Sequence, residues 1–434
     1  DPANAVKHFG RAVELFRTLG DSQSLLSSLA SRALDSAPET IETAFSALRT
    51  RDECVQDTEE ALRLARQTNS QIGQAFVEFV STHVCSSFGE LGQALAHAQE
   101  ALSIATAIEH QVWIVTSYGA LGQLYLLMLE PALAISAFDA GLAVARPLGS
   151  AYWIWNLTSY LALAYVLRQE FPRAEDVLKT LMPRGYQPGN LGERQVARAW
   201  GELALAQGEP DIALQIAEQL IVSAPGDLRQ QPIPHLLALK GEALLALAIS
   251  EASQRRGTLP GGQVIMDFKS LIALKRLEEA VRVLEDAKLG AQQRQAPSVL
   301  WRVHGSLGQV YHLFKREDQA QREWSAAREI IANLAETIDQ TYLREHFVQA
   351  ALQTLPSEKP LLSRRAVAEK FGGLTEREIE VLRAVAQGLT DIQVAEQLVI
   401  SHRTVHSHLN SIYSKLGITS RSAATRYAIE HNLT

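Results

Sequence analysis

Residues 401–417 read SHRTVHSHLNSIYSKLG and present two distinct faces when they are wound as an α-helix. Apolar residues recur at the helical period and predict a buried stripe of Val405, Leu409, Ile412 and Leu416. The opposite face carries hydrogen-bond donors and no acid: Arg403, His406, Ser407, Asn410 and Ser414. A helix with such a face suits the major groove of DNA, where it can reach base edges.

The residues before this helix indicate where it and the two preceding helices begin. Three N-caps are predicted: Thr375 with Glu378, Thr390 with Gln393, and Ser401. We expect a first helix that ends at Gly388, a short second helix over about 391–397, and a third over about 402–415. A short helix, a tight turn at 399–400 and a longer helix make up a helix-turn-helix unit.

The whole C-terminal segment resembles the LuxR-type helix-turn-helix domain. The matching positions follow the family's order: LTERE at 374–378, GLT at 388–390, VA at 394–395, Ser401, Thr404-Val405, His408, Ile412-Tyr413, KLG at 415–417 and Ser420-Arg421. The resemblance implies base contacts by three residues of the third helix: His406, Ser407 and Asn410. It implies contacts to the DNA backbone by Arg403, Thr404, Lys415 and Arg421. The sequence departs from the family at His406, where Lys or Asn is frequent, and at 391–393, where Asn-Lys-Glu is frequent.

Charge is distributed unevenly along the chain. The formal net charge is −7, yet no Asp or Glu occurs from Gln397 to Ile429. This gap favours contact with DNA phosphates, and the alternative is a chance gap on a solvated face. The C-terminal segment as a whole is close to charge balance, so a single copy should bind double-stranded DNA only weakly. We therefore expect it to bind DNA as a homodimer. The last helix offers a small-residue face for dimerisation: Ala423, Ala424, Tyr427 and Ala428.

The first 350 residues contain internal repeats. ALGQLY at 120–125 matches SLGQVY at 306–311, and each copy is followed by a small and a large residue at the same spacing: Ala134 and Phe138, then Ala320 and Trp324. Gly241 with Ala280 and Leu284 forms a weaker copy. The pattern resembles the tetratricopeptide repeat, in which paired helices need a small residue where they cross and a large one beside it.

Repeats of this kind stack into a superhelix with a concave surface. We therefore predict an all-α fold in three parts: a repeat domain over 1–352, a linker over 353–373, and a small four-helix domain over 374–434. The repeats are expected to bind a protein or small-molecule effector, and the alternative is a purely structural spacer. Two prolines, Pro356 and Pro360, indicate the position of the linker because proline interrupts helices.

Composition bounds the remaining possibilities. The sequence has no apolar run long enough to span a membrane, no signal peptide and only two cysteines, Cys54 and Cys85, so we expect a cytoplasmic protein without membrane contact. His402 and His406 form an H-x-x-x-H pair, but no third ligand is placed to complete a zinc shell. We predict no metal site.

No G-x-x-x-x-G-K-[ST] loop and no catalytic grouping occur, so we expect neither a cofactor nor enzymatic activity. Repeats joined to this domain resemble the C-terminal part of large ATP-dependent LuxR-family regulators. An ATP site is thus expected only if an N-terminal NTPase module is missing from this chain. The sequence predicts a bacterial DNA-binding transcription regulator, and the alternative is a helical-repeat scaffold that does not bind DNA.

Overall fold

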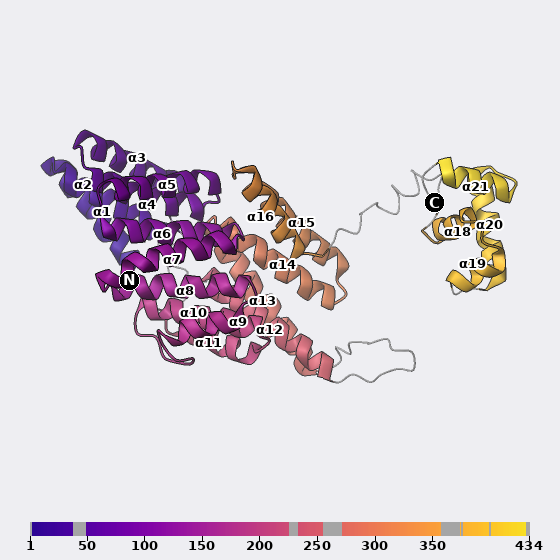
Figure 1. Ribbon diagram of the computed structural model, residues 1–434. Helices are drawn as coiled ribbons and strands as arrows, with labels where there is room; N and C mark the ends of the chain where they lie inside the picture. Colours follow the sequence, from indigo (N-terminus) through magenta and orange to yellow (C-terminus); the bar gives the residue numbers. More distant parts are fainter. Residues whose placement is uncertain are drawn as a thin grey trace. The chain divides into compact units, whose positions relative to one another are not determined.

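The computed structural model describes residues 2–37, 49–224, 233–254, 271–356, 374, 376–398 and 401–430. Every regular element in these ranges is an α-helix, which confirms the predicted fold class. The chain divides into two compact units, Asp1–Pro356 and Ser357–Thr434 (Figure 1). Most of the predicted linker, residues 357–373, lies outside the described ranges. None of the helices in those ranges is long and apolar enough to cross a membrane.

The first unit is a succession of helices, many of which are joined to the next by a short turn. Its helices are α1 Pro2–Leu19, α2 Ser22–Ser36, α3 Arg51–Gln67, α4 Gln71–Ser87, α5 Leu91–Ala107, α6 Gln111–Leu127, α7 Pro131–Leu148, α8 Ala151–Leu167, α9 Phe171–Lys179, α10 Leu191–Ala206, α11 Pro210–Val222, α12 Pro234–Gln254, α13 Leu271–Gln293, α14 Pro297–Leu313, α15 Glu317–Glu336 and α16 Thr341–Gln353. Consecutive helices pack against each other along the chain. The result is the repeating helical hairpin that the sequence predicts.

Glycines explain why the matched sequence copies recur. A Cβ atom on Gly122 of α6 would lie 2.3 Å from the Phe138 ring of α7, and a Cβ atom on Gly308 of α14 would lie 2.3 Å from Trp324 of α15. Gly241 of α12 would meet Leu284 of α13 at 2.5 Å in the same way. The small residues that follow, Ala134, Ala280 and Ala320, are fully buried. Each of these three hairpins thus pairs a notch on one helix with a large side chain on the next.

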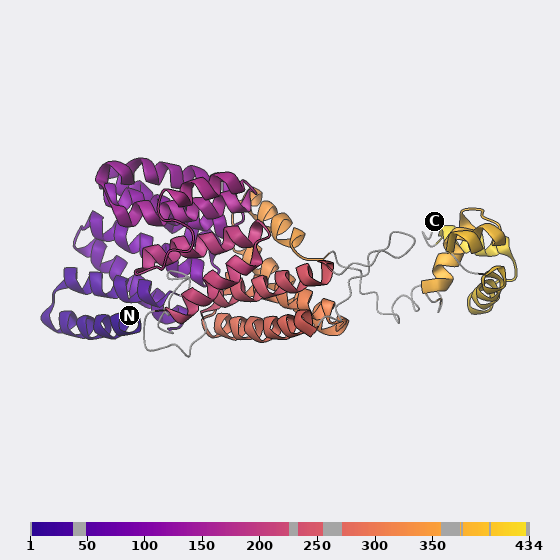
Figure 2. The same ribbon diagram turned by 90° about the horizontal axis from the view of Figure 1, so that it is seen from below.

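The even-numbered helices form one continuous row. From α2 to α14 each of them contacts the next even-numbered helix in addition to its chain neighbours. The odd-numbered helices α3, α5 and α7 contribute Ala61, Ala101 and Leu142 to the buried interior. Figure 2 shows these layers stacked through the first unit. Stacking of this kind gives the unit an inner and an outer surface.

The array also turns back on itself. The backbone N–H of Gly92, at the start of α5, donates to the carbonyl of Thr337 at the end of α15, with an N···O distance of 2.9 Å. Tyr342 of α16 donates its hydroxyl to Glu130 at 2.9 Å, and His346 lies 2.9 Å from the carbonyl of Leu129. One apolar core includes Leu91 of α5 together with Leu334 of α15. Segments more than two hundred residues apart in the sequence are therefore in contact, and these contacts close one turn of the superhelix.

Candidate nucleic-acid interface

The second unit contains the helices α18 Glu376–Ala386, α19 Asp391–Leu398, α20 His402–Leu416 and α21 Arg421–Glu430. Their apolar faces make a core of their own, in which Val381, Leu382, Val405 and Ile412 are fully buried. The stripe predicted for α20 is confirmed, because Val405, Leu409 and Ile412 are buried and Leu416 packs against them. The opposite face of α20 is consequently left to solvent.

Local capping fixes where α19 and α20 begin. The Ser401 Oγ accepts a hydrogen bond from the backbone N–H of Thr404 at 3.1 Å, as predicted for an N-cap. Thr390 and Gln393 form the predicted capping box, with distances of 2.9 Å and 3.4 Å between each backbone nitrogen and the other side chain. Gly417 ends α20 at a φ of +65°. Thr375 and residues 399–400 lie outside the described ranges.

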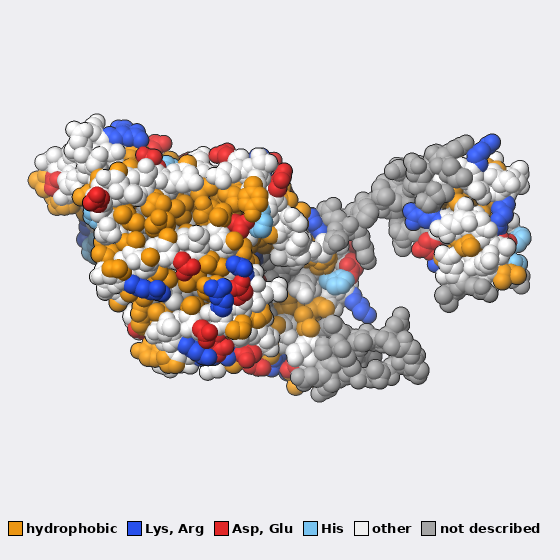
Figure 3. Space-filling model, viewed as in Figure 1, with side chains coloured by type: hydrophobic (Ala, Val, Ile, Leu, Met, Phe, Trp, Pro, Cys, Tyr) orange, Lys and Arg blue, Asp and Glu red, His pale blue; other side chains and the backbone are white. Residues whose placement is uncertain are grey.

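The three predicted base-contacting residues share the exposed face of α20. His406, Ser407 and Asn410 are all exposed, and the His406 Nδ1 lies 3.4 Å from the Asn410 side-chain nitrogen. In Figure 3, Lys, Arg and His side chains line the edge of this unit beside α20. Thr404 is half-buried, with its hydroxyl 2.7 Å from that of Ser401. The side chain of Arg403 lies outside what the structure describes.

Lys415 is held by a buried carboxylate of α18. Its Nζ lies 3.0 Å and 2.7 Å from the two oxygens of Glu378, and the Ser411 hydroxyl donates to the same carboxylate at 2.6 Å. The Glu378 side chain is only 5% exposed, whereas that of Lys415 is 34% exposed. Sequence analysis assigned Glu378 to a capping box and missed this role. The spacing of Ser411 and Lys415, one helical turn apart, was the available signal.

Arg421 is similarly engaged within the unit. Its guanidinium donates to the Asp391 carboxylate and to the backbone carbonyl of Leu389, so it joins the start of α21 to the start of α19. Two of the three predicted backbone-contacting cations, Lys415 and Arg421, therefore have partners inside the protein. Each keeps a partly exposed side chain, at 34% for Lys415 and 38% for Arg421.

The residues of the predicted dimerisation face lie partly in the core of the unit and partly at its surface. Ala424 and Ala428 are fully buried in the core of their own unit, where α21 packs on α18. Small side chains at these two positions allow α21 to pack closely within the unit. Ala423 and Tyr427 are half-buried and are the part of that face left at the surface.

Histidines do not gather into a metal-binding group in the described part of the chain, where no cluster of three His, Cys, Asp or Glu side chains has suitable geometry. His402 and His406 both lie exposed on α20. The neighbour of His406 is an amide, Asn410, which is a hydrogen-bonding partner.

The pair α19–α20, a short helix followed by a longer one with an exposed polar face, has the architecture of a helix-turn-helix DNA-binding unit. Residues 373–428 match the family described as bacterial regulatory proteins, luxR family. The C-terminal unit thus contains a LuxR-type helix-turn-helix domain.

Relatives extend the similarity beyond this domain. The chain is 26% identical to an HTH-type transcriptional regulator of Mycobacterium bovis and to one of Mycobacterium tuberculosis, over 96% of this chain and 45% of each relative. It is 41% identical to the response regulator protein VraR of Staphylococcus aureus, over 15% of this chain and 32% of VraR. The chain spans less than half the length of the mycobacterial relatives that it matches.

Proposed function

We propose that this protein is a transcription regulator that reads DNA through the exposed face of α20, and that it has no catalytic activity of its own. The observation that carries the proposal is the juxtaposition of His406, Ser407 and Asn410 on one exposed face of a capped helix. That helix follows a short helix within a LuxR-type domain. Such side chains can donate to and accept from base edges in the major groove. Since the proposed target is chromosomal DNA, the protein would act in the cytoplasm.

We further propose that two copies bind an inverted repeat. The proposed interface carries few cations, so a single copy would neutralise few phosphates and bind DNA weakly. This supports binding by two copies together. The surface part of α21, with Ala423 and Tyr427, is the proposed contact between copies. The repeat unit would then serve as the sensor or protein-interaction module, supported by its inner surface.

The direct test is DNA binding by the whole chain and by a fragment of residues 363–434. Because the second unit has its own apolar core, the fragment is expected to fold and to retard DNA at low salt. Retardation should weaken as salt rises, and light scattering of the complex should show two copies per inverted repeat. If the whole chain and a helical fragment both leave DNA unshifted at low salt, a scaffold function replaces this proposal.

Asn410→Ala is expected to lower affinity for a site selected from random DNA by about 1–3 kcal/mol and to affect random DNA little. The reason is that Asn410 lies on the exposed face of α20 and its loss removes base contacts without disturbing the buried stripe. Competition gel shifts measure the ratio of the two affinities.

Gln387→Ala is the matched control, since it removes an exposed amide just beyond the end of α18 and outside α20 itself. It should leave both affinities unchanged. An unaltered ratio of selected to random affinity in Asn410→Ala would show that this face of α20 does not read bases.

A further inference from the structure

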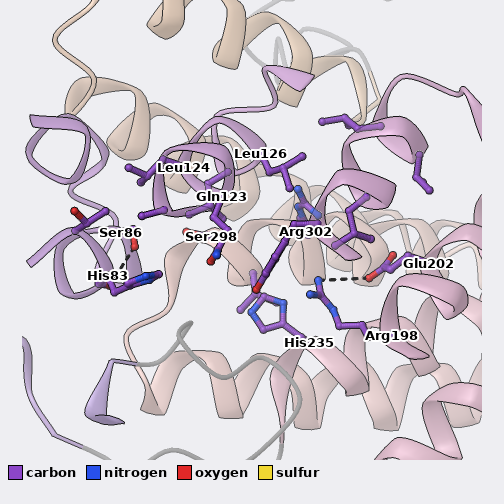
Figure 4. A pocket seen from close by; sticks show the side chains of 18 residues that line it. His83, Ser86, Gln123, Leu124, Leu126, Arg198, Glu202, His235, Ser298 and Arg302 are labelled. Atoms are coloured by element: carbon purple, nitrogen blue, oxygen red, sulfur yellow. Dashed lines mark hydrogen bonds and ion pairs between the residues drawn. The ribbon is translucent and has the colours of Figure 1, made fainter. Parts of the chain in front are cut away.

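The repeat unit contains a cavity of about 180 Å³. Six helices of the even-numbered row line it: α4, α6, α8, α10, α12 and α14. A cavity of roughly 150 Å³ is large enough for benzene, so this one has room for a ring-sized molecule but not for a nucleotide. Figure 4 shows the side chains that face it.

Apolar and charged side chains line different parts of the cavity. Leucines of α6 and α8, including Leu124, Leu126 and Leu163, supply an apolar wall. Arg198, Glu202 and Arg302 lie toward one end in Figure 4, while His83 and Ser86 lie at the other. A pocket with an apolar body and a few polar groups is the usual form of a small-molecule site.

The charged end has an excess of positive charge. Two guanidinium groups line it, and Arg198 is only 7% exposed, whereas Glu202 is the one carboxylate among its described lining residues. Arg198 and Glu202 are 3.8 Å apart. Glu242 accepts a hydrogen bond from the Ser306 hydroxyl, and burial together with the nearby Glu202 carboxylate raises the pKa of Glu242 to about 7. It therefore carries only part of a negative charge at neutral pH.

Ser298 provides an independent indication of a ligand. It lines the cavity, is 7% exposed, and its hydroxyl has no hydrogen-bond partner within the described ranges. Buried hydroxyl groups in native proteins nearly always have one. Ser298 and Arg302 are four residues apart on α14, so they project from the same side of that helix.

We propose that this cavity binds a small organic carboxylate. Its apolar body would lie against Leu124, Leu126 and Leu163, and its carboxylate would accept hydrogen bonds from Arg302 and the Ser298 hydroxyl. Arg198 contributes positive charge from the opposite helix. This site is separate from the DNA-binding face, and its occupancy is measured without DNA, so its test is independent of the proposed function.

The experiment is calorimetric titration of the whole chain with benzoate and with its neutral analogue benzamide. Ligands of this size bind with dissociation constants of roughly 0.1–10 mM, so benzoate should bind at one site in that range and benzamide at least tenfold more weakly. Arg302→Gln should weaken benzoate binding about tenfold or more, because it removes a charge-assisted hydrogen bond. Ser298→Ala, a small change that preserves packing, should weaken it a few-fold.

Arg282→Gln is the matched control, since Arg282 lies on α13 with a side chain that is 73% exposed. It should leave benzoate affinity unchanged, and circular dichroism should show all variants folded. Absence of benzoate binding up to about 10 mM overturns the proposal. So does equal binding of benzamide, or benzoate affinity that is the same in Arg302→Gln as in the original protein.

Discussion

Phe138→Ala is expected to lower the free energy of unfolding of the repeat unit by about 3–5 kcal/mol. The Phe138 side chain is fully buried, fills the notch at Gly122 and stacks on Tyr160 with 6.1 Å between ring centroids. Its removal leaves a cavity that neighbouring helices cannot close without moving. All six tryptophans of the chain, at positions 113, 153, 155, 200, 301 and 324, lie in this unit. Tryptophan fluorescence during urea unfolding therefore reports on it alone.

Tyr186→Ala is the control, because it removes a ring of similar size from a residue that is 48% exposed. It should change stability by less than about 0.5 kcal/mol. The reverse change tests the notch itself: Gly122→Ala should cost about 1–3 kcal/mol through overpacking, and less when Phe138→Leu is also present. Equal effects of Phe138→Ala and Tyr186→Ala would refute the notch-and-ring account of the repeat.

Lys415→Met is expected to destabilise the C-terminal unit by about 2–4 kcal/mol, because it leaves the buried Glu378 carboxylate without its cation. The partial exposure of Lys415 makes the loss smaller than for a fully buried pair. In a unit of this size such a loss is a large fraction of the total stability. Thermal unfolding of the 363–434 fragment, followed by circular dichroism, measures it.

The double variant Glu378→Gln with Lys415→Met separates two roles of the lysine. If Lys415 acts by neutralising Glu378, the double variant regains stability and DNA affinity together. If Lys415 also contacts a phosphate, stability returns but affinity for selected and random DNA stays low, with a shallower salt dependence. Arg383→Met removes an exposed cation from α18 and should leave stability unchanged. A Lys415→Met fragment as stable as this control would show that the ion pair contributes nothing.

Local patterns in the sequence were enough to predict the elements of the C-terminal unit. The Ser401 cap and the stripe through Val405 and Ile412 depend on residues within a few turns of each other, and the structure has both. Periodicity says which face is buried but not what covers it. Ala424 and Ala428 illustrate the limit, because a small-residue face suits a neighbouring helix of the same unit as well as a second copy.

Longer-range contacts could be predicted only where the sequence repeats them. The glycine and aromatic residues of a repeat, such as Gly122 and Phe138, are sixteen positions apart and recur, so their pairing was predictable. The contact between Gly92 and Thr337 has no such recurrence. The cavity draws its lining from six helices, and Arg198 and Arg302, about a hundred positions apart in the sequence, line it together only in the folded array.

The contact of Gly92 with Thr337 also bears on how the protein can vary. Open repeat arrays unfold piecewise from their ends and tolerate gain or loss of whole repeats, since each repeat depends only on its neighbours. Here a Cβ atom on Gly92 would lie 2.1 Å from the Thr337 carbonyl, so the junction has a fixed geometry. Duplicating or deleting a hairpin between α5 and α15 would misalign it. The number of repeats in this turn is therefore constrained, and its unfolding should be cooperative across the junction.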